Sequence, residues 1–300
     1  MVSYLIFTLT VGGIYALLAL SLNLVWGSAG MVNLGLAGLF GVGAYASALA
    51  TGAGAPVLIG WGVAALAGVA AGLIVNFATL KLRDDYLAIV TLGFAEVVRL
   101  IALNERWLTK GADGISGIPA PMKAALGPAG FNLAYLGLVS AVVALVWWLL
   151  ARLDASPYGR TLKAIREDQE LARFAGKPVL RFKFQAFGLS AAIAALAGAL
   201  YAHHQSYFSP DHIQPLITIY IFLGLTAGGV GRPAGAVLGG YAVVLFIELT
   251  RFAAEWVPGL QPVQVAAIRE ILIGLALILL LHLRPQGLLP ETLPKAPRPT

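Results

Sequence analysis

Long apolar stretches separated by short polar segments follow one another along the whole chain. Most of them approach the roughly 20 apolar residues that one helical crossing of a bilayer requires. They cover Tyr4–Val25, Met31–Ala50, Pro56–Leu80, Tyr86–Leu103, Phe131–Ala151, Phe184–His204, Leu216–Gly228, Ala234–Phe252 and Ala267–Leu283. Such unbroken apolar runs exclude the alternating strands of a membrane β-barrel. The pattern therefore predicts an all-α, polytopic transmembrane helical bundle with about eight to ten membrane segments, in which the short seventh stretch is a candidate half-helix.

Small and polar residues interrupt the first apolar region. They are Asn23, Gly27, Ser28, Gly30 and Asn33. An unwound backbone at membrane depth is tolerated only where protein or a water-filled cavity surrounds it. We therefore expect a break inside the membrane at about residues 25–35, where half-helix ends would present N–H and C=O groups to a zwitterionic solute. An ordinary tight turn between two helices is the alternative.

Charged residues are scarce and lie mainly between the apolar stretches. They make up only 11% of the chain, and none precedes Lys81. Segment 152–183 contains eight Lys and Arg residues, whereas segments 205–215 and 255–266 contain none. Because cytoplasmic loops are enriched in Lys and Arg, segment 152–183, Lys81–Arg83 and the C-terminal residues are predicted to be cytoplasmic. Segment 105–130 is then outside, and the side of the N-terminus stays open.

The formal net charge of +6 has the same origin. Basic residues beside membrane spans indicate contact with the lipid surface, not with nucleic acid. We expect one transmembrane domain over residues 1–290, with 152–183 as its cytoplasmic loop. The proline-rich residues 291–300 are predicted to form a disordered cytoplasmic tail.

Within this basic loop, apolar residues recur at helical spacing. They are Leu162, Ile165, Leu171, Ala172 and Phe174, and Gly176 and Pro178 follow as stop signals. The spacing predicts one short amphipathic helix that begins at Thr161. Such a helix is too short to span a membrane, so its apolar face needs a protein partner or the headgroup layer.

Motifs of catalysis are absent from the sequence. The chain has no G-x-x-x-x-G-K-[ST] phosphate loop, no H-E-x-x-H, no G-x-S-x-G and no cysteine. The chain is therefore not expected to be an enzyme, and no cofactor or metal is expected. Inside a span, Glu96 and Arg99 are spaced to pair with each other. Small residues four apart, as in Gly235-x-x-x-Gly239, are interpreted as helix-packing seams.

Several stretches together resemble one transporter family, the LivM-type permease subunits of bacterial branched-chain amino-acid importers of the ATP-binding-cassette class. They are LNLVWGSAG (22–30), LAIVTLGFAEVVR (87–99), GISGIP (114–119), SPYGRTLKAIRE (156–167), AALAGALYA (194–202) and RPQGLLP (284–290). The stretch ELARFAG (170–176) looks like the E-A-A-x-x-x-G signature of such permeases, with Leu in place of the middle Ala. The resemblance runs from about residue 10 to residue 290.

This resemblance implies a non-enzymatic subunit of the bacterial cytoplasmic (inner) membrane. With a second homologous permease subunit it would form the path for branched-chain, aliphatic amino acids. Two cytoplasmic ATPase subunits would hydrolyse ATP, and an extracytoplasmic solute-binding protein would deliver the solute. Residues 160–177 would be the coupling helix in a groove of one ATPase, held by Leu162, Ile165, Leu171 and Phe174 as apolar anchors.

Two sets of candidate site residues follow from the break, the basic loop and the resemblance together. The coupling candidates are Gly159, Arg160, Leu162, Ile165, Arg166, Glu167, Glu170, Leu171, Ala172, Phe174 and Gly176. The candidates for the translocation path are Asn23, Gly27, Ser28, Gly30, Asn33, Gly35, Thr91 and Gly93.

Other functions stay open at this point. A permease for urea or short amides would share the same motifs. An ion-coupled secondary transporter would show inverted repeats and isolated ionisable groups at mid-membrane. An intramembrane enzyme would need a convergent nucleophile and base. The sequence shows neither of these last two patterns clearly.

Overall fold

Helices make up nearly all of the structure, a computed structural model that describes residues 2–79, 84–255, 262–284 and 286–291. Nine apolar helices coincide with the nine predicted stretches. They are α1 (Val2–Leu22), α2 (Leu36–Gly52), α3 (Val57–Ala78), α4 (Asp84–Asn104), α6 (Lys123–Ala155), α9 (Val179–Gln205), α10 (Pro215–Gly228), α11 (Pro233–Glu255) and α12 (Pro262–Leu283). Six helices of the described chain are long and apolar enough to cross a membrane, and α2 and α10 are apolar but shorter. The chain is thus an all-α, multi-pass membrane protein.

Close contacts at small residues fix the centre of the bundle, where α9 packs against α1, α2 and α3. A Cβ atom added to Gly198 of α9 would lie only 1.9 Å from the carbonyl oxygen of Phe40 in α2. A Cβ added to Gly239 of α11 would lie 1.9 Å from the carbonyl oxygen of Gly224 in α10. The backbones approach so closely that only glycine fits, which confirms the predicted packing seams.

Buried polar side chains also join these helices. Ser21 of α1 and Ser190 of α9 place their hydroxyl oxygens 2.9 Å apart, and each hydroxyl donates to the other residue's carbonyl oxygen. The Nε2 atom of His203 lies 2.8 Å from the hydroxyl of Ser47 in α2. In a membrane, where no water competes, such pairs fix the register of neighbouring helices.

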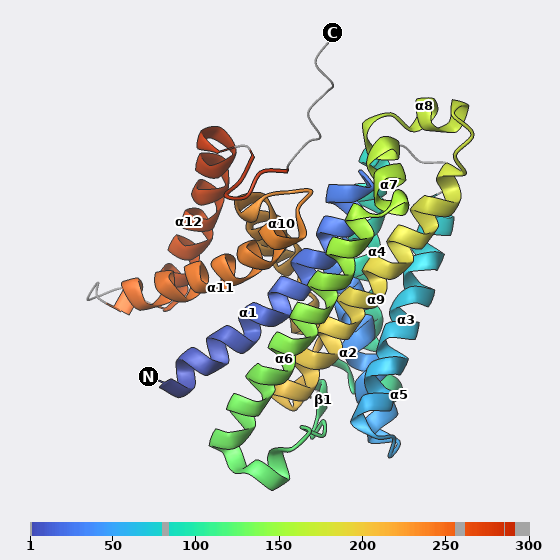
Figure 1. Cartoon of the computed structure of the whole chain (residues 1–300). Coiled ribbons are helices and arrows are strands. Elements are labelled where there is room, and N and C mark those ends of the chain that lie inside the picture. The colour runs from blue at the N-terminus through green and yellow to red at the C-terminus, as the bar shows by residue number, and fades with distance from the viewer. Residues whose placement is uncertain (1, 80–83, 256–261, 285, 292–300) are drawn as a thin grey trace.

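Short elements cap the two ends of the bundle. At one end lie α5 (Arg106–Thr109), η2 (Gly111–Asp113), the antiparallel pair β1 (Ile115–Ser116) and β2 (Tyr207–Phe208), and η3 (Pro210–Ile213). Two further helices, α7 (Pro157–Glu167) and α8 (Gln169–Phe174), lie at the opposite end (Figure 1). The C-terminal helices α10–α12 lie on the other side of α1 from α3.

Candidate coupling site

The first membrane helix ends in an irregular segment. α1 continues as the π-helix η1 (Asn23–Ser28), and residues 29–35 then have no regular structure before α2 begins. Single-turn π-helices are rare and occur frequently at functional sites. The structure therefore has an irregular connection in this region and not a tight turn between two regular helices, and the position of the break inside the membrane stays a prediction.

Backbone and side-chain groups from a distant segment hold the first half of the break. The side-chain oxygen of Asn23 accepts a hydrogen bond from the backbone N–H of Gly231, at 2.8 Å. A Cβ atom added to Gly27 would lie 2.8 Å from the same backbone nitrogen. Glycine at position 27 thus lets η1 contact the segment between α10 and α11 directly.

The second half of the break packs on α4. The backbone N–H of Leu34 donates to the hydroxyl of Thr91 at 3.0 Å, and that of Gly35 donates to the side-chain oxygen of Asn33 at 2.8 Å. The amide nitrogen of Asn33 is buried and has no hydrogen-bond partner among the described residues. Asn33, Gly35 and Thr91 therefore lie together. Gly93 does not join them, because nothing in the described chain lies within 4 Å of a Cβ built there.

The basic loop contains two helices where the sequence predicted one. α7 is capped by Ser156, whose hydroxyl accepts from the backbone N–H of Gly159, and it ends at Glu167. Asp168 then adopts an extended conformation and accepts hydrogen bonds from the first N–H groups of α8 at 2.9 Å. Asp favours N-cap positions because its side chain competes for backbone donors, so the helix breaks here.

Two of the four expected apolar anchors are buried inside the chain itself. Leu162 is 0% exposed and Ile165 is 2% exposed, so the expectation that a partner contacts them is wrong. Ile165 packs with Val179 of α9. In contrast, Leu171 and Phe174 of α8 are 65% and 88% exposed. The apolar surface available to a partner is therefore on α8.

The remaining coupling candidates divide in the same way. Buried ones are Gly159 and Ala172, and exposed ones are Arg160, Glu167, Glu170 and Gly176. Gly159 has to be glycine, because an added Cβ would lie 2.5 Å from the carbonyl oxygen of Asp154. Gly176 has a φ of 76°, which favours glycine and ends the segment as predicted.

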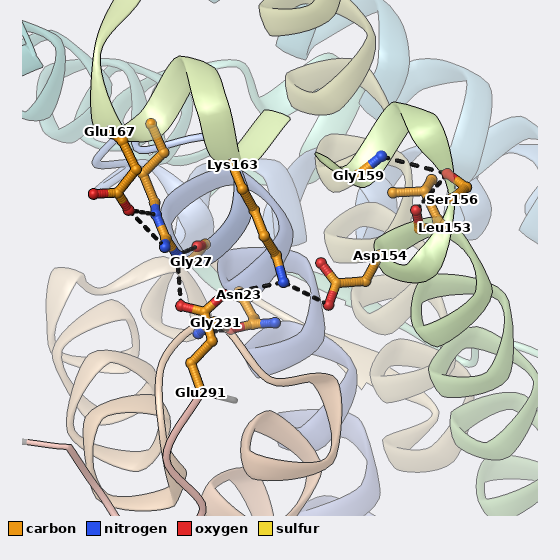
Figure 2. Close-up of polar contacts among 11 residues, drawn as sticks. Asn23, Gly27, Leu153, Asp154, Ser156, Gly159, Lys163, Glu167, Gly231 and Glu291 are labelled. Atoms are coloured by element: carbon orange, nitrogen blue, oxygen red, sulfur yellow. Dashed lines mark hydrogen bonds and ion pairs between the residues drawn. The ribbon is translucent and has the colours of Figure 1, made fainter. Parts of the chain in front are cut away.

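A network of ion pairs joins α7 to three other segments (Figure 2). Arg166 donates to the carbonyl oxygen of Gly27 in η1, and it pairs with Glu291 at 3.0 Å. Lys163 pairs with Glu291 at 3.0 Å and with Asp154 at the end of α6 at 2.9 Å. These four charged side chains are only 17–28% exposed. The junction therefore fixes α7 to the broken helix, to α6 and to the C-terminal segment at once; we call it the α7 junction.

The charges of the α7 junction reinforce one another. Burial disfavours the protonated form of Lys163, but its ion pairs with Asp154 and Glu291 outweigh burial and raise its pKa. The pKa of Arg166 is raised in the same way: burial opposes the charge, and Glu167 and Glu291 more than compensate. Both basic groups therefore stay charged at neutral pH and hold the carboxylates in place.

The C-terminal segment takes part in this site, although a disordered tail was predicted from residue 291. The backbone N–H groups of Leu288 and Leu289 donate to the carbonyl oxygens of Ala227 and Gly228, at 2.8 and 2.9 Å. They satisfy carbonyls at the end of α10 that have no partner within the helix. Glu291 is then held by its two ion pairs, so an ordered chain extends at least to this residue. The predicted tail beyond it, 292–300, lies outside the described residues.

Sequence reasoning missed Asp154 and Glu291 of the α7 junction, and it missed Gly231, which donates to Asn23 of the broken helix. One signal could have indicated Glu291, because it is the only acidic residue after Glu270 and lies on the same predicted side as the basic loop. No local pattern indicated Gly231, whose role depends on contact with a residue 208 positions away.

A polar hollow of about 290 Å³ lies beside the junction. The end of the broken helix forms one side of it, with Ala29 and Gly30, and the turn between α7 and α8 forms the other. Gly30 has a φ of 75° and would place a Cβ 3.0 Å from Cγ of Arg166. The two elements can therefore contact each other at glycine positions and keep an open space next to the contact.

Comparison with known proteins agrees with this architecture. The family described as "Branched-chain amino acid transport system / permease component" matches residues 4–281, nearly the whole chain. The chain belongs to this family. It is therefore a membrane permease component, and the resemblance inferred from its sequence motifs is confirmed.

Individual relatives of this permease include transport proteins from different organisms. The high-affinity branched-chain amino acid transport system permease protein LivM of Escherichia coli (strain K12) is 35% identical over 94% of this chain and 69% of its own length. The probable LivM of Methanocaldococcus jannaschii is 28% identical over 93% of this chain and 91% of its own. The autoinducer 2 import system permease protein LsrC of Salmonella typhimurium is 29% identical, over 65% of this chain and 57% of its own. No solved structure matches the chain significantly.

Proposed function

We propose that this permease is one of two homologous membrane subunits of an ATP-driven importer for branched-chain, aliphatic amino acids in the bacterial cytoplasmic membrane. Two ATPase subunits bind at the end of the bundle that carries α7 and α8, and an extracytoplasmic solute-binding protein delivers the amino acid at the other end. The LivM relatives, which are similar over nearly the whole chain, support this substrate class. LsrC, a permease protein of an autoinducer 2 import system, is similar over a smaller part of the chain.

The exposed apolar surface of α8 carries the proposal. Phe174 is 88% exposed and Leu171 is 65% exposed, on a six-residue helix outside the membrane spans. An aromatic and an aliphatic side chain on one short helix are suited to a hydrophobic groove of a partner protein. An ATPase that binds α8 would pull on α7, because the turn at Asp168 connects the two helices directly.

The α7 junction would transmit a movement of α7 to the broken helix. Arg166 hydrogen-bonds to the carbonyl oxygen of Gly27, so a displacement of α7 acts on η1 and on the irregular residues after it. The buried amide of Asn33 in this segment offers a donor to the carboxylate of an amino acid when the path opens. ATP hydrolysis would thus be coupled to the broken helix through the α7 junction.

Replacing Phe174 with Ala tests the proposal. We expect ATPase subunits to dissociate from the purified complex, and ATP-driven leucine uptake into proteoliposomes to fall at least about tenfold, since buried aromatic anchors contribute 2 kcal/mol or more at interfaces. Trp107 is a matched control for ATPase attachment, because it is 81% exposed but lies on α5, at the other end of the bundle. The variant Trp107→Ala should keep its ATPases.

Two results would contradict the proposal. One is full ATPase attachment and uptake in Phe174→Ala. The other is uptake driven by an ion gradient in vesicles that contain no ATPase.

A further inference from the structure

The outward face of α4 carries an ion pair within a membrane span. Nε of Arg99 donates to a carboxylate oxygen of Glu96 at 2.9 Å, and the two side chains are 25% and 40% exposed. They lie five and eight residues before the end of α4 at Asn104, roughly 7 and 12 Å along the helix axis. This places both charges inside the outer half of the predicted crossing.

The spans α3 and α6 are as little buried by the rest of the chain as α4, so their exposed faces can be compared with that of α4. In an apolar stretch of 18 residues within each helix, only 22% of the residues of α3 and 28% of those of α6 are buried, and the value for α4 is 22%. Yet residues 57–78 of α3 and residues 130–151 of α6 contain no Asp, Glu, Lys or Arg. The three helices are thus similarly uncovered by the rest of the chain, but only α4 carries charges on its exposed side.

Contact between the ion pair Glu96–Arg99 and lipid acyl chains would be energetically unfavourable. Ionised side chains within spans almost always face protein or a water-filled cavity, because hydrocarbon cannot solvate them. One turn from Glu96, Gly93 adds a position where a neighbouring backbone can approach closely, since no atom of the described chain lies within 4 Å of a Cβ built there. A charged pair next to an open glycine fits a second protein helix and does not fit an acyl chain.

We infer that this face of α4 is the contact surface for the second permease subunit, with one of its helices lying over Gly93 and the pair Glu96–Arg99 enclosed between the subunits. The inference rests on the proposed function, which supplies the second subunit. The inner face of α4 supports it, because Thr91 holds the segment after the broken helix and Ala95 contacts α2 at Gly38. The subunit interface is therefore one helix away from the break, and the solute path lies along this interface.

Filling the glycine tests the contact directly. A Cβ at Gly93 has no described group outside its own helix within 4 Å, so Gly93→Leu should insert and fold normally but reduce copurification of the second permease about tenfold. Gly62→Leu on α3 is the matched control, because a Cβ at Gly62 also has nothing within 4 Å. This control should retain the second subunit.

Site-specific crosslinking gives an independent readout, because the chain contains no cysteine. A maleimide photo-crosslinker on Val97→Cys of α4 should form adducts with the second permease, and the same probe on Ile74→Cys of α3 should not. Both parent side chains are well exposed in the single chain, at 53% and 69%.

The inference is overturned if the second permease copurifies with Gly93→Leu and Val97→Cys gives only lipid adducts, or if the crosslinks form from Ile74→Cys instead. In these cases the proposed function stands, since the subunits still assemble. If no second permease copurifies with the unmodified chain, the proposed function fails and this interface fails with it.

Discussion

Replacing Glu291 with Gln should loosen the C-terminal segment from the α7 junction without unfolding the protein. Glu291 is the common partner of Lys163 and Arg166, at 3.0 Å from each. After the substitution, Lys163 keeps Asp154, and Arg166 keeps Glu167 and the carbonyl of Gly27. The loss is therefore that of two ion pairs whose remaining partners compensate in part.

The burial of the junction sets the magnitude. Exposed ion pairs contribute about 0.2–1 kcal/mol, and removal of one partner from a fully buried pair costs about 3–5 kcal/mol. The side chain of Glu291 is 17% exposed, and glutamine keeps one acceptor oxygen. We therefore expect the local free energy of opening to fall by about 1–2 kcal/mol, equivalent to a factor of about 5–30 in the open population.

Hydrogen exchange in nanodiscs measures this factor at two amides. The N–H groups of Leu288 and Leu289 are protected by hydrogen bonds to the end of α10. In Glu291→Gln they should exchange about 5 to 30 times faster. Glu167→Gln is the control, since Glu167 is 70% exposed and pairs with the same arginine; its effect should stay below about twofold. Equal exchange in Glu291→Gln and the unmodified chain, or equal acceleration in both variants, would refute the reasoning.

Three further predictions concern other parts of the molecule. Gly239→Ala should lower the free energy of unfolding by about 1–3 kcal/mol in thermal denaturation, because its Cβ would overlap the carbonyl of Gly224, whereas Gly137→Ala, with open space around it, should not. Asp168→Ala should destabilise α8 by about 1 kcal/mol, seen as faster exchange of the Leu171 amide, and an unchanged rate would exclude a capping role. The raised pKa of Lys163 means that its stabilisation is complete below the ordinary lysine value of 10.5 and is lost as the pH rises through the raised value. Protection of Leu289, corrected for intrinsic exchange, should therefore stay constant from neutral pH up to that range, and a loss near neutral pH would contradict the assignment.

The membrane helices and the break could be predicted because their causes are local. The length of an apolar run decides whether a segment crosses, and Gly27, Gly30 and Asn33 weaken a helix wherever they occur. The burial of Leu162 and Ile165 could not be predicted in this way. Their periodicity shows that they share a face of α7, but the same pattern fits contact with a partner and contact with α9. The structure distinguishes the two, because Ile165 packs with Val179 of α9 and Leu162 belongs to the main core of the bundle.

The split of the basic loop into two helices and the role of Glu291 could not be predicted, for two different reasons. Asp168 lies in a run of polar residues without apolar periodicity, where a continuous helix and a capped break are both compatible with the sequence. Its extended backbone and its two accepted hydrogen bonds decide the matter. Glu291 is 125 residues from Arg166 in the chain, and no local pattern in the sequence indicates that these two side chains pair.

Because Gly27, Arg166 and Glu291 meet at one point, the number of membrane crossings between any two of them has to be even. From Gly27 to Arg166 it passes through α2, α3, α4 and α6, and from Arg166 to Glu291 through α9, α10, α11 and α12. Both numbers are even, so the three segments can meet on one side of a bilayer when each of these eight helices crosses it once. If one of α9–α12 failed to insert, Arg166 and Glu291 would lie on different sides of the membrane. Closure of the α7 junction therefore depends on the insertion of the helices on both sides of α7 in the chain.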